Sequence, residues 1–211
     1  MKIGFFGDSF CEEMWNQHSV WYGYKTYLRM VKDHYQADIV NLGQGGSSVW
    51  DTVLLQFPKF ENNLPDVCIF CWTDSLRLYH PKVRNICYGT VVDQKKINHQ
   101  ISGFFNRNLF SAAESYFKNL YFPEKAELET KALLHYFDDF VLSKIEGKTK
   151  ILHFWSFDPV YDWKHGKEIK EPLVSIANQP NEHDNVDISP NHFGDHKKNQ
   201  QMFELIKANL D

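Results

Sequence analysis

Three short segments of this sequence carry groups suited to acyl transfer. In GDSF at 7–10, a turn would expose the Ser9 hydroxyl beside a backbone N–H that can stabilise an oxyanion. The glycine-rich segment NLGQGGSS at 41–48 lets the backbone approach a substrate closely. In SPNHFG at 189–194, His192 could take the serine proton near neutral pH. Each segment also has an ordinary explanation: the first as a helix cap, the second as a tight turn and the third as a surface histidine. The hypothesis of acyl transfer therefore rests on the order of all three along the chain.

The elements that must position these groups alternate between strands and helices. Short apolar runs predict buried parallel strands, and apolar positions at helical spacing predict amphipathic helices. Such alternation indicates an α/β fold with a parallel sheet covered on both faces, whose ligands bind beyond the carboxyl ends of the strands. The predicted strands are 2–6, 37–42, 66–72 and 148–155, and the predicted helices are 21–35, 48–57 and 200–210.

Two stretches exceed a minimal version of this plan. Residues 76–144 are mainly helical in pattern, with helical periodicity at 112–121 and 125–142, and we interpret them as an insertion between strands. Residues 158–190 are polar and rich in Pro, Asn, Asp and His, and predict a long functional loop. The length of 211 residues favours a single domain over 1–211 that contains this insertion.

The order of these motifs resembles the SGNH/GDSL hydrolase family. That family has Gly-Asp-Ser near the N-terminus, Asn and then Gly after the second strand, Gly-x-Asn-Asp after the third, and Asp-x-x-His near the C-terminus. The first block matches at 7–10 and the second at 41–46. The resemblance implies a flavodoxin-like three-layer α/β/α sandwich, with Ser9 as nucleophile, His192 as general base, and the N–H groups of Ser9 and Gly46 in the oxyanion hole.

The third block departs from the family pattern. It reads Cys-Trp-Thr-Asp-Ser at 71–75, so the family's Gly and Asn are both absent. Either Thr73 or Asp74 takes the position of the Asn, depending on the alignment. Thr73 could donate a hydrogen bond to an oxyanion, whereas Asp74 could do so only when protonated. One oxyanion donor is worth about 10²–10³ in turnover, so this departure bears directly on catalysis.

The fourth block also departs from the family pattern. Ser189 stands three residues before His192, where the family has Asp. Asp187 lies five residues before His192 and Asp184 eight before, and either could orient the histidine. We assign Asp187 to the candidate triad, and keep His196 as a second candidate base.

The composition excludes several other classes of function. A net charge of −4 and a pI of about 6.2 give no basic surface for nucleic acid. The pair Cys68 and Cys71 falls in a strand, which would send the two thiols to opposite faces, and we expect all four cysteines to be free. No signal peptide and no apolar run of membrane-spanning length is present, so we expect a cytoplasmic protein that does not bind membranes.

The predicted activity is hydrolysis of an ester, which the family resemblance makes an O-acetylated carbohydrate, a short acyl ester or a lipid ester. The mechanism needs neither a metal nor an organic cofactor. Two alternatives stand beside it. One is a catalytically weak or inactive binding protein on the same fold, favoured by the altered third and fourth blocks. The other is a flavin or nucleotide binder that uses the loop 43–48, although this loop is neither G-x-G-x-x-G nor a Gly-Lys-Ser/Thr loop.

Overall fold

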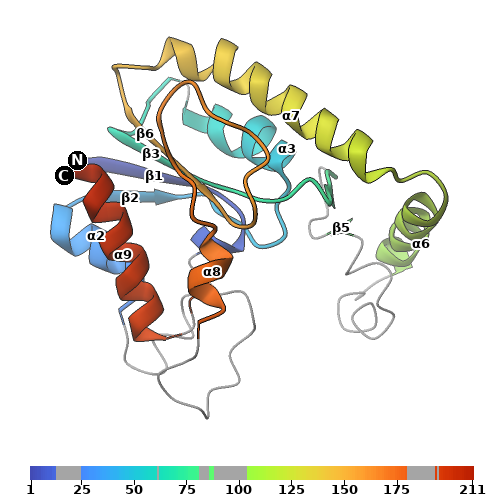
Figure 1. Ribbon diagram of the computed structural model, residues 1–211, viewed down its shortest axis with the longest axis horizontal. Helices are drawn as coiled ribbons and strands as arrows, with labels where there is room; N and C mark the ends of the chain where they lie inside the picture. The colour runs from blue at the N-terminus through green and yellow to red at the C-terminus, as the bar shows by residue number, and fades with distance from the viewer. Residues whose placement is uncertain (13–24, 61, 81–85, 88–103, 180–192, 194) are drawn as a thin grey trace.

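A computed structural model of the chain describes residues 1–12, 25–60, 62–80, 86–87, 104–179, 193 and 195–211. A central sheet separates two helical layers, with α2, α8 and α9 on one face and α3 and α7 on the other (Figure 1). The two ends of the chain lie side by side at one edge of this arrangement (Figure 1). The predicted three-layer α/β architecture is therefore confirmed.

The elements of the sheet and of its covering layers follow in chain order. The strands are β1 (Lys2–Gly7), β2 (Asp38–Asn41), β3 (Val67–Trp72), β4 (Arg77–Leu78), β5 (Ile86–Cys87), β6 (Lys150–Trp155) and β7 (Lys167–Ile169). The α-helices are α2 (Tyr27–Tyr35), α3 (Val49–Asp51), α6 (Phe104–Asn119), α7 (Pro123–Phe140), α8 (Leu173–Ala177) and α9 (His196–Leu210). Short 3₁₀ or π turns are η1 (Ser9–Cys11), η2 (Thr52–Gln56), η3 (Phe57–Phe60) and η4 (Leu142–Lys144).

The main sheet has the strand order β2-β1-β3-β6-β7, and all of its neighbours pair in parallel. Numbered by position along the chain, this is the 2-1-3-4-5 order of flavodoxin-like folds. The order reverses direction at β1, between β2 and β3. A topological switch point of this kind is where such folds bind ligands, beyond the carboxyl ends of the strands. Ser9, which follows β1, lies at this point.

Side chains of the central strands alternate between two cores, as the two-residue period of a strand requires. Phe5, Ile69 and Cys71 pack in the core that includes α2, α8 and α9. Phe6 and Cys68 pack in the core that includes α3 and α7. The two cysteines of the C-x-x-C pair thus lie on opposite faces of the sheet, as predicted, and Cys11, Cys68 and Cys71 are free thiols.

The loop predicted over 158–190 is wrong in part. Its described portion holds the edge strand β7 and the helix α8, which closes the α2 and α9 face. The helix predicted from residue 21 starts at Tyr27, because Thr26 caps it by accepting a hydrogen bond from the Arg29 N–H, and 21–24 lie outside the described residues. The final helix starts at His196, four residues earlier than predicted, where Asp195 caps it.

In the described part of 76–144, α6 and α7 confirm the predicted helices, but the same stretch also contains the antiparallel pair β4 and β5. A third small core joins this pair to α6, through Ile86, Phe110 and Phe117, with Leu78 packed against it. Helix α7 instead buries one side against the sheet through Leu134 and other residues of its inner face. Its far end leads toward α6, which stands apart from the main sheet (Figure 1).

Candidate active site

The Ser9 turn begins where β1 ends. Asp8 caps the 3₁₀ turn η1, its Oδ1 accepting a hydrogen bond from the Phe10 N–H at 3.0 Å. Ser9 is the first residue of that turn and is partly buried. Within the described residues, neither its hydroxyl nor its N–H has a hydrogen-bond partner. Ser9 therefore keeps both groups available, the hydroxyl for a base and the N–H for an oxyanion.

Gly7, immediately before this turn, has to be glycine. Its φ of +138° is rare for L side chains, and a Cβ there would lie 2.1 Å from the Cys71 carbonyl oxygen. The buried side chain of Gln56 fixes the same residue, since its Oε1 accepts from the Gly7 N–H at 2.6 Å and its Nε2 donates to the Gly7 carbonyl at 2.9 Å. The direction in which the chain leaves β1 is thus held from two sides.

The glycine-rich turn after β2 packs directly on the Ser9 turn. The Asn41 side chain donates to the Cys11 carbonyl at 2.5 Å and accepts from the Gly43 N–H at 2.8 Å. A Cβ at Gly43 would lie 2.3 Å from the Cys11 sulfur, so only glycine permits this approach. The Asn of the second block therefore positions the two turns against each other.

Of the N–H groups in this glycine-rich turn, that of Gly46 stands out. The Gly43 N–H is used by Asn41, and the Gly45 N–H donates to the Glu12 carboxylate at 2.9 Å. The Gly46 N–H has no acceptor within the described part of the chain, and its φ of +74° is left-handed. The Glu12 carboxylate on this turn also disfavours a phosphate there, which weighs against the nucleotide-binding alternative.

The third turn follows β3 and contains both predicted third-block residues. Thr73 is 3% exposed, and its buried Oγ1 has no hydrogen-bond partner among the described residues. Asp74 accepts a hydrogen bond from the Leu76 N–H through Oδ1 at 3.0 Å. Burial raises the pKa of the Asp74 carboxyl, while the nearby Arg77 opposes that rise. Thr73 thus offers an uncommitted hydroxyl, whereas Asp74 already acts as an acceptor.

Two residues that sequence reasoning missed link these turns through the Asp8 carboxylate, which is 1% exposed. The Ser156 hydroxyl, at the end of β6, donates to Asp8 Oδ1 at 2.9 Å. The Arg77 guanidinium lies 3.7 Å from Asp8 Oδ2 and donates to the Ser47 carbonyl at 3.1 Å. Arg77 thus bridges the residue before Ser9 and the residue after Gly46, and no local sequence signal marks it for this role.

The candidate base His192 and the candidate acids Asp187 and Asp184 lie outside the described residues. His196, the second candidate base, is the exposed first residue of α9. Across the described ranges, no cluster of three or more His, Cys, Asp or Glu side chains is arranged to hold a metal ion.

A buried histidine, His153 of β6, has a structural role on the α7 side of the sheet. Its Nδ1 accepts from the Trp72 indole N–H at 3.0 Å, and its Nε2 lies 2.9 Å from the His165 carbonyl oxygen. The ring stacks on Trp163 with centroids 3.9 Å apart. Burial lowers its pKa to about 3, so it stays neutral, with the proton on Nε2.

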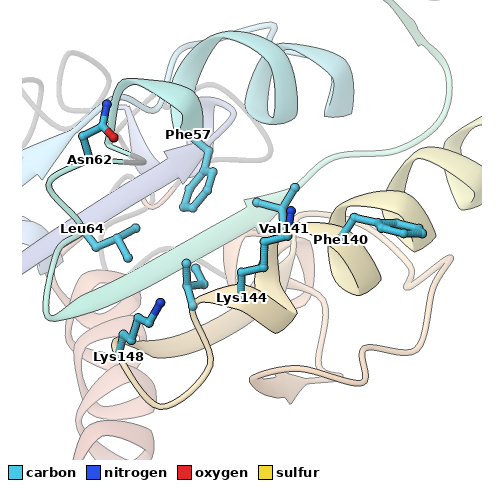
Figure 2. A pocket seen from close by; sticks show the side chains of 8 residues that line it. Phe57, Asn62, Leu64, Phe140, Val141, Lys144 and Lys148 are labelled. Atoms are coloured by element: carbon cyan, nitrogen blue, oxygen red, sulfur yellow. The ribbon is translucent and has the colours of Figure 1, made fainter.

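A cavity of about 340 Å³ lies at the other end of the sheet from Ser9, beside the amino ends of β3 and β6. Phe57 and Leu64 reach it from the segment before β3, and Val141, Lys144 and Lys148 from the segment before β6 (Figure 2). None of the predicted site residues lines it. It is therefore separate from the three turns that surround Ser9.

Comparison with known proteins adds a distant structural likeness. No protein-family model matches the chain, and no curated protein matches it. Among solved structures, the chain is similar to an acetyl xylan esterase at 16% sequence identity and a TM-score of 0.31. That alignment covers 72% of this chain and 57% of the esterase, so this chain spans little more than half of that protein. No helix within the described ranges has the length and apolar character needed to cross a bilayer.

Proposed function

We propose that this protein is a serine esterase that cleaves an ester through an acyl-enzyme on Ser9. The observation that carries the proposal is a set of three donors at the switch point of the sheet that have no acceptor among the described residues: the Ser9 N–H, the Gly46 N–H and the Thr73 hydroxyl. They come from three turns that the Asn41, Arg77 and sheet contacts hold side by side. Preorganised donors of this kind stabilise the oxyanion of acyl transfer.

In the proposed mechanism, His192 takes the proton of Ser9 while the Ser9 oxygen attacks the ester carbonyl. The negative charge that develops on the carbonyl oxygen is stabilised by the donors of Ser9, Gly46 and Thr73. Collapse of this intermediate releases the alcohol, which takes the proton from His192. Water then attacks the acyl-enzyme by the same route, and Asp187 orients the histidine. The family resemblance makes O-acetylated carbohydrates and short acyl esters the first substrates to test.

The proposal is tested by hydrolysis of p-nitrophenyl acetate and by labelling with a fluorophosphonate probe. We expect Ser9→Ala to abolish labelling and to lower turnover by at least about 10³-fold. Ser175→Ala is a matched control, because Ser175 is exposed on α8 and its hydroxyl donates to the Glu171 carboxylate and the Pro172 carbonyl, both close in the chain. Equal hydrolysis by wild type and Ser9→Ala would contradict the esterase for this substrate class.

One observation favours a second candidate, a binding protein without turnover. Asp74 places a carboxylate close to where the family has an amide donor, and an ionised carboxylate opposes an oxyanion. In that case wild type would neither react with the probe nor turn over esters, and it would still retain an acetylated oligosaccharide in a binding assay. Covalent labelling of Ser9 would exclude this candidate.

A further inference from the structure

Helix α7 carries an apolar strip on the side that faces away from the sheet. Leu128, Ala132, Tyr136 and Phe140 follow one another at intervals of four residues, and we call them the α7 outer stripe. Positions four apart lie on one side of a helix. The exposed fractions are 68% for Leu128 and 56% for both Tyr136 and Phe140. Large apolar side chains gathered on one exposed face indicate an interaction surface.

The inner side of the same helix is already buried against the sheet, so the α7 outer stripe is not part of the core. Leu133, Leu134 and Phe137 are at most 7% exposed and pack against the sheet. The rings of Tyr136 and Phe140 stack on each other, with centroids 5.4 Å apart, and form one flat apolar surface. Helix α7 runs along the outer edge of the molecule, where a partner has access to it (Figure 1).

The side chains along the stripe have a mirrored order about Ala132. Leu128 lies four residues before Ala132 and Tyr136 four after, and both are apolar. Lys125 lies seven residues before and Asp139 seven after, with opposite charges. A surface with this pattern is complementary to its own copy turned by 180°, which is what a two-fold interface requires. The small side chain at its centre allows two helices to approach closely.

We propose that α7 pairs with α7 of a second copy of this chain, antiparallel, across a two-fold axis at Ala132. Leu128 then packs on Tyr136 of the other copy, and Lys125 faces Asp139 there. Asp139 already holds Lys164 at 2.9 Å, so the added lysine joins an existing ion pair.

The next pair inward fits as well, because Glu129 lies three residues before Ala132 and His135 three after. At the ends of the interface, Phe140 falls opposite Glu124 in the first turn of the other helix, and Phe122, the residue just before that turn, is 62% exposed. A standard interface buries about 1,200–2,000 Å², and a single pair of helices buries less. The dimer is therefore weak, and its subunits exchange readily. This inference is independent of the proposed esterase activity.

The test is sedimentation velocity of the full chain from about 1 μM to about 1 mM. Wild type should shift from monomer to dimer with concentration. Ala132→Glu should raise the dissociation constant more than about tenfold, because it sets two like charges together at the axis. Ala112→Glu makes the same change at an exposed position of α6 and should leave the dimer unchanged. A wild type that stays monomeric, or an Ala132→Glu variant that dimerises like wild type, overturns the proposal.

Two further variants test the geometry. Ala132→Cys should form a disulfide-linked dimer on mild oxidation, well above the background of wild type and of Ala112→Cys. Lys125→Glu should weaken the dimer, because it replaces attraction to Asp139 by repulsion. In a parallel pair Lys125 would face its own copy, and the reversal would have no effect. Absence of the cross-link together with an unaffected Lys125→Glu dimer contradicts the antiparallel arrangement.

Discussion

Thr73→Val should have opposite effects on activity and on stability. The substitution keeps the shape of a side chain whose residue is 3% exposed, and it removes a hydroxyl that has no hydrogen-bond partner in the described part of the chain. A buried polar group left without a partner costs about 1–3 kcal/mol, so its removal should raise the free energy of unfolding by about 1 kcal/mol. In a protein of this length that corresponds to a rise in Tm of about 2–4 °C.

The same hydroxyl is the proposed third donor to the oxyanion. Loss of one such donor lowers kcat by about 10²–10³-fold, equivalent to about 2.7–4 kcal/mol of transition-state stabilisation. The assays are ester hydrolysis under saturating substrate and thermal unfolding of the same preparations. A residue that only supports the fold would lower activity and stability together, so the opposite signs identify the donor.

Thr149→Val is the matched control for this experiment. Thr149 is also buried, but it precedes β6 at the far end of the sheet, and its hydroxyl donates to the Cys68 sulfur at 3.6 Å. We expect kcat to stay within about twofold of wild type and Tm to fall slightly, because a satisfied bond is lost. An unchanged kcat in Thr73→Val would refute the donor role, and a Tm several degrees below wild type would refute the absence of a partner.

Three further predictions concern stability. Gly7→Ala should prevent accumulation of folded protein, because the new Cβ meets the Cys71 carbonyl oxygen. Gly147→Ala, with φ +76° and no atom near its Cβ, should lower the free energy of unfolding by only about 1 kcal/mol. Soluble yield and thermal unfolding compare the two variants. Ser156→Ala should lower the free energy of unfolding by about 1–3 kcal/mol, because Asp8 Oδ1 loses a donor. In the same urea titrations, the exposed Ser175→Ala should stay within about 0.5 kcal/mol of wild type. Burial gives His153 a pKa of about 3 in the folded protein, against about 6.5 when unfolded. The free energy of unfolding should therefore fall by about 1.4 kcal/mol per pH unit as the pH falls from 6.5 toward 3. NMR should show a neutral ring from pH 8 to 5, and a protonated ring at pH 5 would contradict this.

The central strands were predictable because each is a short apolar run that ends in a turn residue. The runs of β1, β3 and β6 are buried on both faces, which leaves a continuous hydrophobic signal. β7 was missed because it is a three-residue edge strand, Lys-Glu-Ile, whose sequence is mostly polar. Edge strands owe their pairing to the neighbour they meet, which the local pattern does not encode.

The candidate site, too, is only partly predictable from the sequence. The Ser9 and Gly46 turns follow from local glycine and Asx chemistry, so sequence reasoning could place them on the ends of strands. Ser156 bonds to Asp8 from 148 residues away, and Gln56 bonds to Gly7 from 49 residues away. These contacts depend on the finished packing of the sheet, and nothing in the nearby sequence distinguishes Ser156 or Gln56 from any other polar residue.

Arg77 makes the stability of the site depend on a small core that lies outside the two main cores. It precedes Leu78 in β4, which rests on the small core of Ile86, Phe110 and Phe117. A small separate core can open locally at a lower free energy than the whole protein. Such an opening would withdraw the guanidinium from Asp8 and Ser47 while β1, β3 and β6 stay folded. Thermal inactivation would then precede global unfolding, and the upper temperature limit for function would be set by the β4–α6 unit instead of by the sheet.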